Sequence, residues 1–406
     1  MSLNIRPILS SLLRNRTGAI LVALQIALAL AILVNATYIV KQRVDSINRP
    51  SGIDDANLFA IDSSGFTSRY DYATSVSDDL AYLRALNGVI AATPANGIPL
   101  SGNGSASTLY KAPGHKFSDG VDAFIYQMDE QGLQTLGARL IAGRNFRKEE
   151  ILPPMRADDQ LRPVSQVVIT LELAQALFAD GNALGKTTYD PFGRPISIIG
   201  VIDNIVGPWT STDYGRRVFF TPEQPLLYGF HYLVRTQPGR RDELMRIAEE
   251  HLSRSDPNRV IKSVHSIELY EKSSFLSERI TAISLVIVTA LLLAVAALGI
   301  FGLATFNVST RTKQIGTRRA VGARKRDIIR QFLVENALIT TAGIVVGCAL
   351  ALGVGYQLSR QYNLPRLDLY YLLGGVLLLW VLGQLAARQP AGRAAAISPS
   401  VATRTV

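Results

Sequence analysis

The run GNALGKTT, from Gly181 to Thr188, is the stretch whose residue types come closest to nucleotide chemistry. A phosphate-binding loop has four residues between its first glycine and the Gly-Lys pair, so that its backbone amides curl around the phosphates. Here three residues intervene, and Asp180 stands where the glycine is needed. We interpret the run as a turn before a strand, with nucleotide binding as the weaker alternative.

Histidines and paired acids are the other candidates for chemistry. The four histidines lack the spacing of a zinc site: His115, His231, His251 and His265. The adjacent acids Asp54/Asp55, Asp78/Asp79 and Glu149/Glu150 diverge on regular elements, and Asp78 and Asp79 suit a helix start, where the macrodipole favours negative charge. Neither a GxSxG nor an HExxH motif is present. The sequence therefore predicts no catalytic residues, cofactor site or metal site on this chain.

Four uncharged apolar runs are long enough to cross a membrane, since a helix of about 20 residues spans the hydrocarbon core. They predict an α-helical membrane protein with four transmembrane helices plus a large α+β extracytoplasmic domain. The expected segments are a cytoplasmic amphipathic helix (1–17), helix 1 (18–40), the extracytoplasmic domain (41–279), helix 2 (280–306), a cytoplasmic loop (307–336), helix 3 (337–356), a short outer loop (357–369), helix 4 (370–387) and a cytoplasmic tail (388–406).

The net charge of +10 is concentrated beside these runs, above all in 307–336. The large middle region holds slightly more acidic than basic residues, so the charge gives no support to nucleic-acid binding. Loops rich in Lys and Arg stay in the cytoplasm, which places both termini inside and 41–279 outside. The single cysteine, Cys348, excludes a disulfide within the chain.

Short alternating runs, separated by glycine and proline, predict a mixed fold for 41–279. The expected strands are 58–61, 124–128, 166–170, 196–203, 218–220 and 232–235, and the expected helices are 78–86, 171–179 and 241–254. Two polar stretches, 101–108 and 152–163, are expected to be surface loops.

Small residues recur four apart in two of the predicted spans, and this spacing lets helix backbones approach closely. Ala23, Ala27 and Ala31 lie in helix 1, and Gly343 and Gly347 form a GxxxG pair in helix 3. We expect these residues to pack membrane helices together, with a chance glycine pair as the alternative.

The basic segment from Arg311 to Asn336 is expected to be helical in two pieces, broken by Gly316 and Gly322. Apolar residues at spacings of three and four make the second piece amphipathic: Ile328, Ile329, Phe332 and Leu333. We expect this face to lie on the membrane. Attraction to anionic lipid is the alternative role for Arg324 to Arg326.

The order of these segments resembles the MacB-like and FtsX-type permeases of ABC transporters. The strongest match is KQIGTRRAVGARKRDIIRQFLVEN, Lys313 to Asn336, which resembles the family's cytoplasmic coupling segment. Further matches to the family's periplasmic core domain are LNGV, LGARLIAGRNF, VVITLELAQALF, ALGKTTYD and IIGVIDN. The resemblance implies ATPase-coupling residues at Lys313, Gln314, Ile315, Gly316, Arg318, Arg319, Ala320, Val321, Gly322 and Ala323. The family usually has an acid where Gln314 stands, so the contact there is expected to lack a charge pair.

This resemblance implies a permease in the bacterial inner membrane, with its domain in the periplasm and no enzyme activity of its own. MacB carries a nucleotide-binding domain on the same chain and none is recognisable here, so ATP and Mg²⁺ are expected on a separate ABC ATPase dimer. Other implied partners are a second permease, identical or paralogous, a periplasmic adaptor, and membrane lipids. The expected function is mechanotransmission for efflux of a peptide antibiotic, a macrolide-like compound or an amphiphile. A non-transporting signal complex that regulates a periplasmic enzyme or sensor, or lipoprotein extraction, is the alternative.

Overall fold

The computed structural model describes residues 16–67, 69–114, 116–153, 163–209, 214–225, 231–362 and 367–397. The chain forms two compact units, Met1–Ile47 with Glu278–Val406, and Asn48–Ser277. We call the first the helical bundle and the second the α+β domain.

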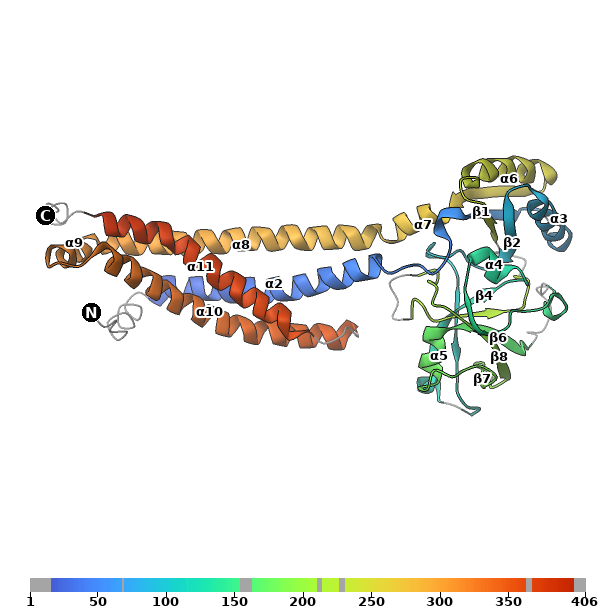
Figure 1. The fold of residues 1–406 in the computed structure, drawn as a ribbon, viewed down its shortest axis with the longest axis horizontal. Coiled ribbons are helices and arrows are strands. Elements are labelled where there is room, and N and C mark those ends of the chain that lie inside the picture. The colour runs from blue at the N-terminus through green and yellow to red at the C-terminus, as the bar shows by residue number, and fades with distance from the viewer. Residues whose placement is uncertain are drawn as a thin grey trace. The chain divides into compact units, whose positions relative to one another are not determined.

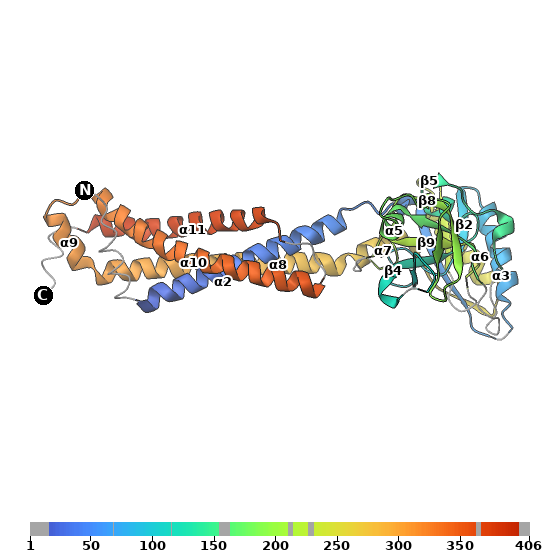
Figure 2. The ribbon, with the colours of Figure 1, turned by 90° about the horizontal axis from the view of Figure 1, so that it is seen from below.

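Four helices of the bundle are long and apolar enough to cross a membrane. They are α2 (Arg16–Ile47), α8 (Leu276–Thr310), α10 (Lys325–Tyr362) and α11 (Leu369–Ala396), and the short α9 (Thr312–Ala320) lies between α8 and α10 in the chain. Figures 1 and 2 show α9 at the end of the bundle where α8 ends and α10 begins. The predicted fold class is confirmed, although each helix runs past the span predicted for it.

Small residues bring α2 and α10 into close contact. A Cβ atom on Gly343 would lie 2.6 Å from the carbonyl oxygen of Ala23, and one on Gly347 would lie 3.0 Å from the Cα of Ala27. Deeper in the bundle, Asn35 donates to the carbonyl oxygens of Ala31 and Ala351, at 2.8 and 3.1 Å. Because a side chain larger than hydrogen would separate the backbones, the glycines set the distance between these two helices.

Helix α8 is packed much less tightly than α2. Of its most apolar stretch only 11% is buried, against 44% for α2. Its contacts with α2 include the Gln25 side chain, which donates to the carbonyl oxygen of Val295 at 2.8 Å, and Leu303 beside Gly18. Ala296 and Ile300 are the α8 residues that reach the buried core of the bundle. Most of the α8 surface is therefore left for lipid or for another protein.

The α+β domain contains two sheets. The first, in the order β11-β1-β10-β2, is antiparallel throughout, and the second, in the order β3-β4-β9-β6-β8-β5 with β7 beside β8, is mixed. The strands are β1 (Leu58–Gly65), β2 (Val89–Ala95), β3 (Ser105–Leu109), β4 (Val121–Gln127), β5 (Leu140–Gly143), β6 (Gln166–Thr170), β7 (Thr187–Tyr189), β8 (Pro195–Ile202), β9 (Val218–Thr221), β10 (His231–Thr236) and β11 (Arg259–Ser266). The helices are η1 (Asp55–Asn57), α3 (Tyr72–Ala85), η2 (Phe117–Asp119), α4 (Gly132–Leu136), η3 (Lys148–Glu150), α5 (Leu171–Leu177), α6 (Arg241–Ser255) and α7 (Ile267–Ser274).

Helices α3 and α6 cover the first sheet, and their apolar faces meet Phe59, Ile61 and Tyr232 in one core. Helix α5 covers part of the second sheet through Leu173 and Leu177. Each sheet thus has a hydrophobic core of its own, as expected where a layer of helices buries the apolar face of a sheet.

Two expectations for this domain are wrong. Helix α3 begins at Tyr72 rather than at Asp78, because Asp71 caps it by accepting from the backbone amides of Ala73 and Thr74. Asp79 therefore lies inside the helix and is buried. The second half of the expected loop 101–108 belongs to β3, which pairs with β4. The expectations for 1–15, His115, most of 152–163 and 398–406 concern residues outside those described.

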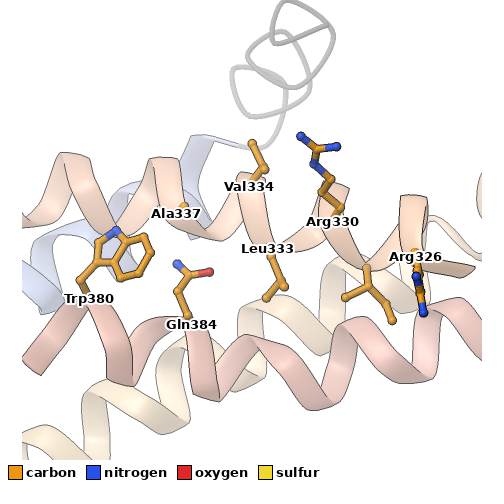
Figure 3. A pocket seen from close by; sticks show the side chains of 8 residues that line it. Arg326, Arg330, Leu333, Val334, Ala337, Trp380 and Gln384 are labelled. Atoms are coloured by element: carbon orange, nitrogen blue, oxygen red, sulfur yellow. The ribbon is translucent and has the colours of Figure 1, made fainter. Parts of the chain in front are cut away.

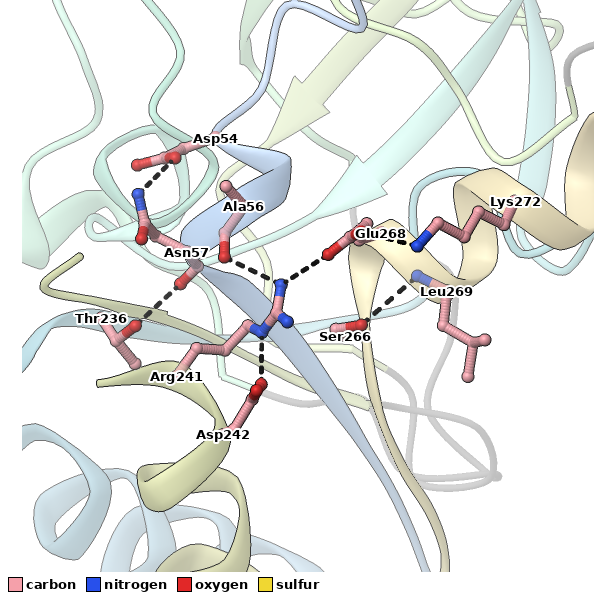
Figure 4. A network of polar contacts seen from close by, with 10 residues as sticks. All are labelled: Asp54, Ala56, Asn57, Thr236, Arg241, Asp242, Ser266, Glu268, Leu269 and Lys272. Atoms are coloured by element: carbon pink, nitrogen blue, oxygen red, sulfur yellow. Dashed lines mark hydrogen bonds and ion pairs between the residues drawn. The ribbon is translucent and has the colours of Figure 1, made fainter. Parts of the chain in front are cut away.

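A polar network fixes α7 to the first sheet (Figure 4). Arg241, at the start of α6, donates to the Ala56 carbonyl oxygen at 2.9 Å and pairs with Glu268 of α7 at 3.2 Å. Glu268 also pairs with Lys272 at 2.7 Å, and Ser266 caps α7 by accepting from the Leu269 amide. Since α8 follows α7 directly in the chain, this network holds the segment through which the domain continues into the bundle.

The ion pair between Arg259 and Asp79 is buried, with 1% and 5% of the two side chains exposed, and Tyr232 donates to the same carboxylate. Replacing Arg259 by Met leaves a buried carboxylate without its partner, which costs about 3–5 kcal/mol. We expect this loss in urea unfolding of the full chain, followed by Trp209 fluorescence in a Trp380→Phe background. Arg139→Met is the control, because 77% of its side chain is exposed in its pair with Asp203 and such pairs contribute about 1 kcal/mol or less. Equal losses for the two variants would contradict this account of the core.

Burial raises the pKa of Asp55 to about 6, although Ser51 donates to its carboxylate and opposes the shift. A raised folded-state pKa gives stability that is present below the unfolded-state value and lost as the pH rises to about 6. Because of the Asp55 carboxyl group, we expect the domain to be less stable at pH 8 than at pH 4.5. Asp55→Asn should remove that difference and stabilise the domain at pH 8 by about 1–2 kcal/mol, a figure reduced for the partial exposure of Asp55. The same urea experiment at both pH values measures it, and an unchanged pH dependence in the variant would show that another group is responsible.

Candidate functional site

Helix α9 and the turn after it form the candidate site. The turn is closed by backbone hydrogen bonds from Gly322 to the Arg319 carbonyl at 3.1 Å and from Ala323 to the Arg318 carbonyl at 3.0 Å. Gly322 has φ of +99°, a conformation that suits glycine at the end of a helix. Gly316, by contrast, is buried inside α9, so the expected break at Gly316 is wrong and the break lies at Gly322 alone.

The inner face of α9 packs on the bundle. Ile315 is 5% exposed and shares an apolar cluster with Ile328 and Phe332 of α10 and with Ala391 and Ala394 of α11. The face of α10 that was expected to lie on the membrane thus contacts protein through Ile328 and Phe332. This cluster holds α9 against the start of α10 and the end of α11.

Arg319 ties α9 to the end of α11. Its Nη1 donates to the carbonyl oxygens of Ala395 and Ile397, at 2.9 and 2.8 Å. These carbonyls lie at the end of α11, where a cation is favoured by the helix dipole and supplies the donor that the last carbonyls lack. Arg319, predicted as a coupling residue, therefore holds the site together from inside.

Arg311 joins the end of α8 to α10. It pairs with Glu335 at 2.9 Å, and only 18% and 4% of the two side chains are exposed. The next residue of α10, Asn336, donates to the Gly383 carbonyl of α11 at 2.9 Å. We call Arg311 and Glu335 the clip, since they connect the two helices that flank α9.

The outward face of α9 is largely exposed, and its Arg318 donates to the Gln331 side chain of α10. The exposed residues of the segment are Lys313, Gln314, Thr317, Arg318, Ala320, Val321 and Gly322, and Val321 is 85% exposed. Apart from Thr317, these outward residues were all predicted as coupling residues, and the other predicted ones form an inner set of Ile315, Gly316, Arg319 and Ala323. An apolar side chain as exposed as Val321, surrounded by basic residues, is suited to contact with another protein.

Sequence reasoning missed Arg311, Glu335 and Thr317. Glu335 carried a usable signal, because an acid at the entrance of an apolar span is costly unless a base pairs with it. Thr317 carried none, since its exposure depends on which face of α9 packs on the bundle.

The other motifs occupy structural positions. GNALGKTT forms a turn before β7, and Lys186 pairs with Asp180 at 2.9 Å. His251 stacks on Tyr82, and His231 lies 3.5 Å from Asp62. Among the described residues, no group of three or more His, Cys, Asp or Glu side chains could hold a metal ion.

Two protein-family models match the chain. Residues 19–250, more than half of it, match the MacB-like periplasmic core domain, and residues 286–399 match the FtsX-like permease C-terminal model. The first match covers α2 and most of the α+β domain, and the second contains α9 and the clip.

Curated relatives include the uncharacterized ABC transporter permease YknZ of Bacillus subtilis strain 168, which is 24% identical over 308 residues. That match covers 74% of this chain and 74% of YknZ. The macrolide export ATP-binding/permease protein MacB of Neisseria gonorrhoeae is 26% identical over 293 residues. That match covers 69% of this chain and 43% of MacB, so the chain spans less than half the length of that relative.

Two solved structures are similar to the chain at low TM-scores. The periplasmic region of MacB from Actinobacillus actinomycetemcomitans is 16% identical, with a TM-score of 0.33, over 56% of this chain and 97% of that one. The extracellular domain of YknZ from Gram-positive bacteria is 13% identical, with a TM-score of 0.31, over 50% of this chain and 100% of that one.

The resemblance in the sequence is therefore confirmed by the two family models, which fall on the α+β domain and on the helices around α9. The chain belongs to the MacB-like ABC transporter permeases, with a MacB-like periplasmic core domain and an FtsX-like C-terminal region.

Proposed function

We propose that this chain is a permease subunit whose α9 receives a separate ABC ATPase dimer, which binds the ATP and Mg²⁺. One observation carries the proposal: α9 presents an exposed basic and apolar face while its other face is fixed to α8, α10 and α11. A force applied to such an element is transmitted to the helices that hold it.

The basic residues around α9 support a cytoplasmic position for this end of the bundle, because loops rich in Lys and Arg remain inside. The termini then lie in the cytoplasm and the α+β domain in the periplasm of a bacterial inner membrane. In this orientation α9 reaches the compartment that contains ATP.

The clip joins the end of α8 to α10, so a movement of α9 and of the start of α10 reaches α8. Helix α8 follows α7, and α7 is fixed to the first sheet through Glu268 and Arg241 (Figure 4). ATP-driven closure of the ATPase would therefore alter the α+β domain without a substrate path through the bundle.

Efflux of a peptide antibiotic, a macrolide-like compound or an amphiphile is the use of this movement that we propose, because one relative is named as a macrolide exporter. A second permease, identical or paralogous, and a periplasmic adaptor complete the proposed assembly. Transport into sealed vesicles separates efflux from regulation of a periplasmic enzyme or sensor and from lipoprotein extraction.

Val321→Asp tests the docking face. The change places a charge at an exposed apolar position, and we expect the permease-dependent ATPase rate of the neighbouring-gene ATPase to fall about tenfold, as when one interface anchor is lost. Val260→Asp, at a 45% exposed valine of β11, is the matched control and should leave the rate unchanged. Full ATPase stimulation by Val321→Asp would show that the ATPase docks elsewhere.

Glu335→Gln tests the clip. The amide keeps the shape but removes the charge, leaving a largely buried guanidinium unpaired at a cost of about 1–3 kcal/mol. We expect faster hydrogen exchange in α9 and reduced ATPase stimulation, with partial recovery in the swapped pair Arg311→Glu/Glu335→Arg. Arg318→Gln removes an exposed hydrogen bond to Gln331 and serves as the control for hydrogen exchange. If α9 exchanges equally in all variants, the clip does not hold it.

A further inference from the structure

A pocket of about 360 Å³ lies between α10 and α11 on the outside of the bundle. It is lined by Arg326, Ile329, Arg330, Leu333, Val334, Ala337, Trp380 and Gln384. In Figure 3, Trp380 and Gln384 of α11 point toward α10, and Leu333 points back toward α11. The pocket is thus a groove between two helices that both cross the membrane.

Its charged and apolar parts are separated along α10. Arg326 and Arg330 lie in the first two turns of the helix, one turn apart, and the lining from Leu333 to Ala337 is apolar. From Arg326 to Ala337 the helix rises about 16 Å, at 1.5 Å per residue. A ligand that fills the groove therefore needs a head that meets cations and a tail of hydrocarbon.

The two arginines have no acidic partner among the described residues, unlike Arg311 in the clip. The Nε2 of Gln384 is buried and likewise lacks a hydrogen-bond acceptor in the described part of the chain. Figure 3 shows the Arg330 side chain pointing away from α11, so the two cations lie at the rim of the groove, and the Gln384 amide is a further donor in its lining. An anionic head with several acceptor oxygens would satisfy them, and Arg binds phosphate particularly well.

Protein segments fit the groove less well. Residues 1–15 are apolar but contain Arg6 and Arg14 and no acid, so the two arginines of the groove would repel them. The basic segment of a second copy is disfavoured for the same reason. Charge complementarity and the apolar lining together favour a membrane amphiphile.

We propose that this groove binds one anionic diacyl phospholipid, with its phosphate at Arg326 and Arg330 and an acyl chain along Leu333, Ala337 and Trp380. The bound lipid reduces the positive charge at the start of α10 and fills the space between α10 and α11 beside the candidate coupling site. The site is distinct from the exposed face of α9.

Trp380 lies in the groove and is one of two tryptophans, so its fluorescence reports on the site once Trp209 is replaced by Phe. The full-length Trp209→Phe chain is reconstituted in phosphatidylcholine vesicles with increasing fractions of dibrominated phosphatidylglycerol or dibrominated phosphatidylcholine. We expect the phosphatidylglycerol to reach half of its quenching at a fraction about tenfold lower, in keeping with the attraction of two basic residues. Arg326→Gln/Arg330→Gln should make the two lipids equal.

Arg324→Gln/Lys325→Gln is the matched control, because it removes the same charge from neighbouring exposed positions that do not line the groove. This variant should keep the preference. Equal quenching by both lipids in the parent chain would overturn the proposal, as would a preference that survives Arg326→Gln/Arg330→Gln. Absence of quenching by either lipid would show that protein fills the groove and would also overturn it.

Discussion

The ion pair of Arg311 with Glu335 is the interaction on which the α9 end of the bundle depends. Both charges are largely withdrawn from water, so each needs the other, and neither helix can shift without exposing a charge to an apolar environment. The Arg319 contacts with the last carbonyls of α11 add a second constraint of the same kind. Together they turn a nine-residue helix, too short to be stable alone, into a fixed part of the bundle.

In the α+β domain, the short helix α7 is likewise held in place by an ion pair, between Arg241 and Glu268. Arg241 reaches both η1 and α7, and it lies at the start of α6, which itself packs on the first sheet. A helix of eight residues is held in place by the domain rather than by its own hydrogen bonds. An arginine–glutamate pair thus holds the chain on each side of α8: Arg241 with Glu268 before the helix and Arg311 with Glu335 after it.

Much of this arrangement could be predicted from the sequence, and its gaps have physical causes. Long uncharged runs and strands with strong apolar patterns, such as β6 and β8, have local signals. Strand β2 was missed because it contains Pro94, which is tolerated since β2 is an edge strand. Asp79 was misplaced because its partner Arg259 is distant in sequence.

The candidate site, too, could be predicted from the sequence only in part. The sequence identified the basic segment, but its pattern could not show that Arg318 is exposed while Arg319 points inward. These neighbours differ by about 100° around the helix, and only the packing of Ile315 on α10 and α11 decides which one faces the bundle. The clip could not be predicted either, because Arg311 and Glu335 are distant in sequence and meet only in the folded chain.

The sparse packing of α8 has a mechanical consequence. Along α8, side chains such as Ile283, Val286 and Leu291 are more than half exposed, so the rest of this chain covers little of the helix and a membrane would surround it with hydrocarbon. Sliding in such surroundings exchanges one lipid contact for another and changes the buried apolar area little. Helix α8 can therefore be displaced along α2, α10 and α11 at little cost over most of its length, and the clip and the α7 network at its two ends limit how far it moves.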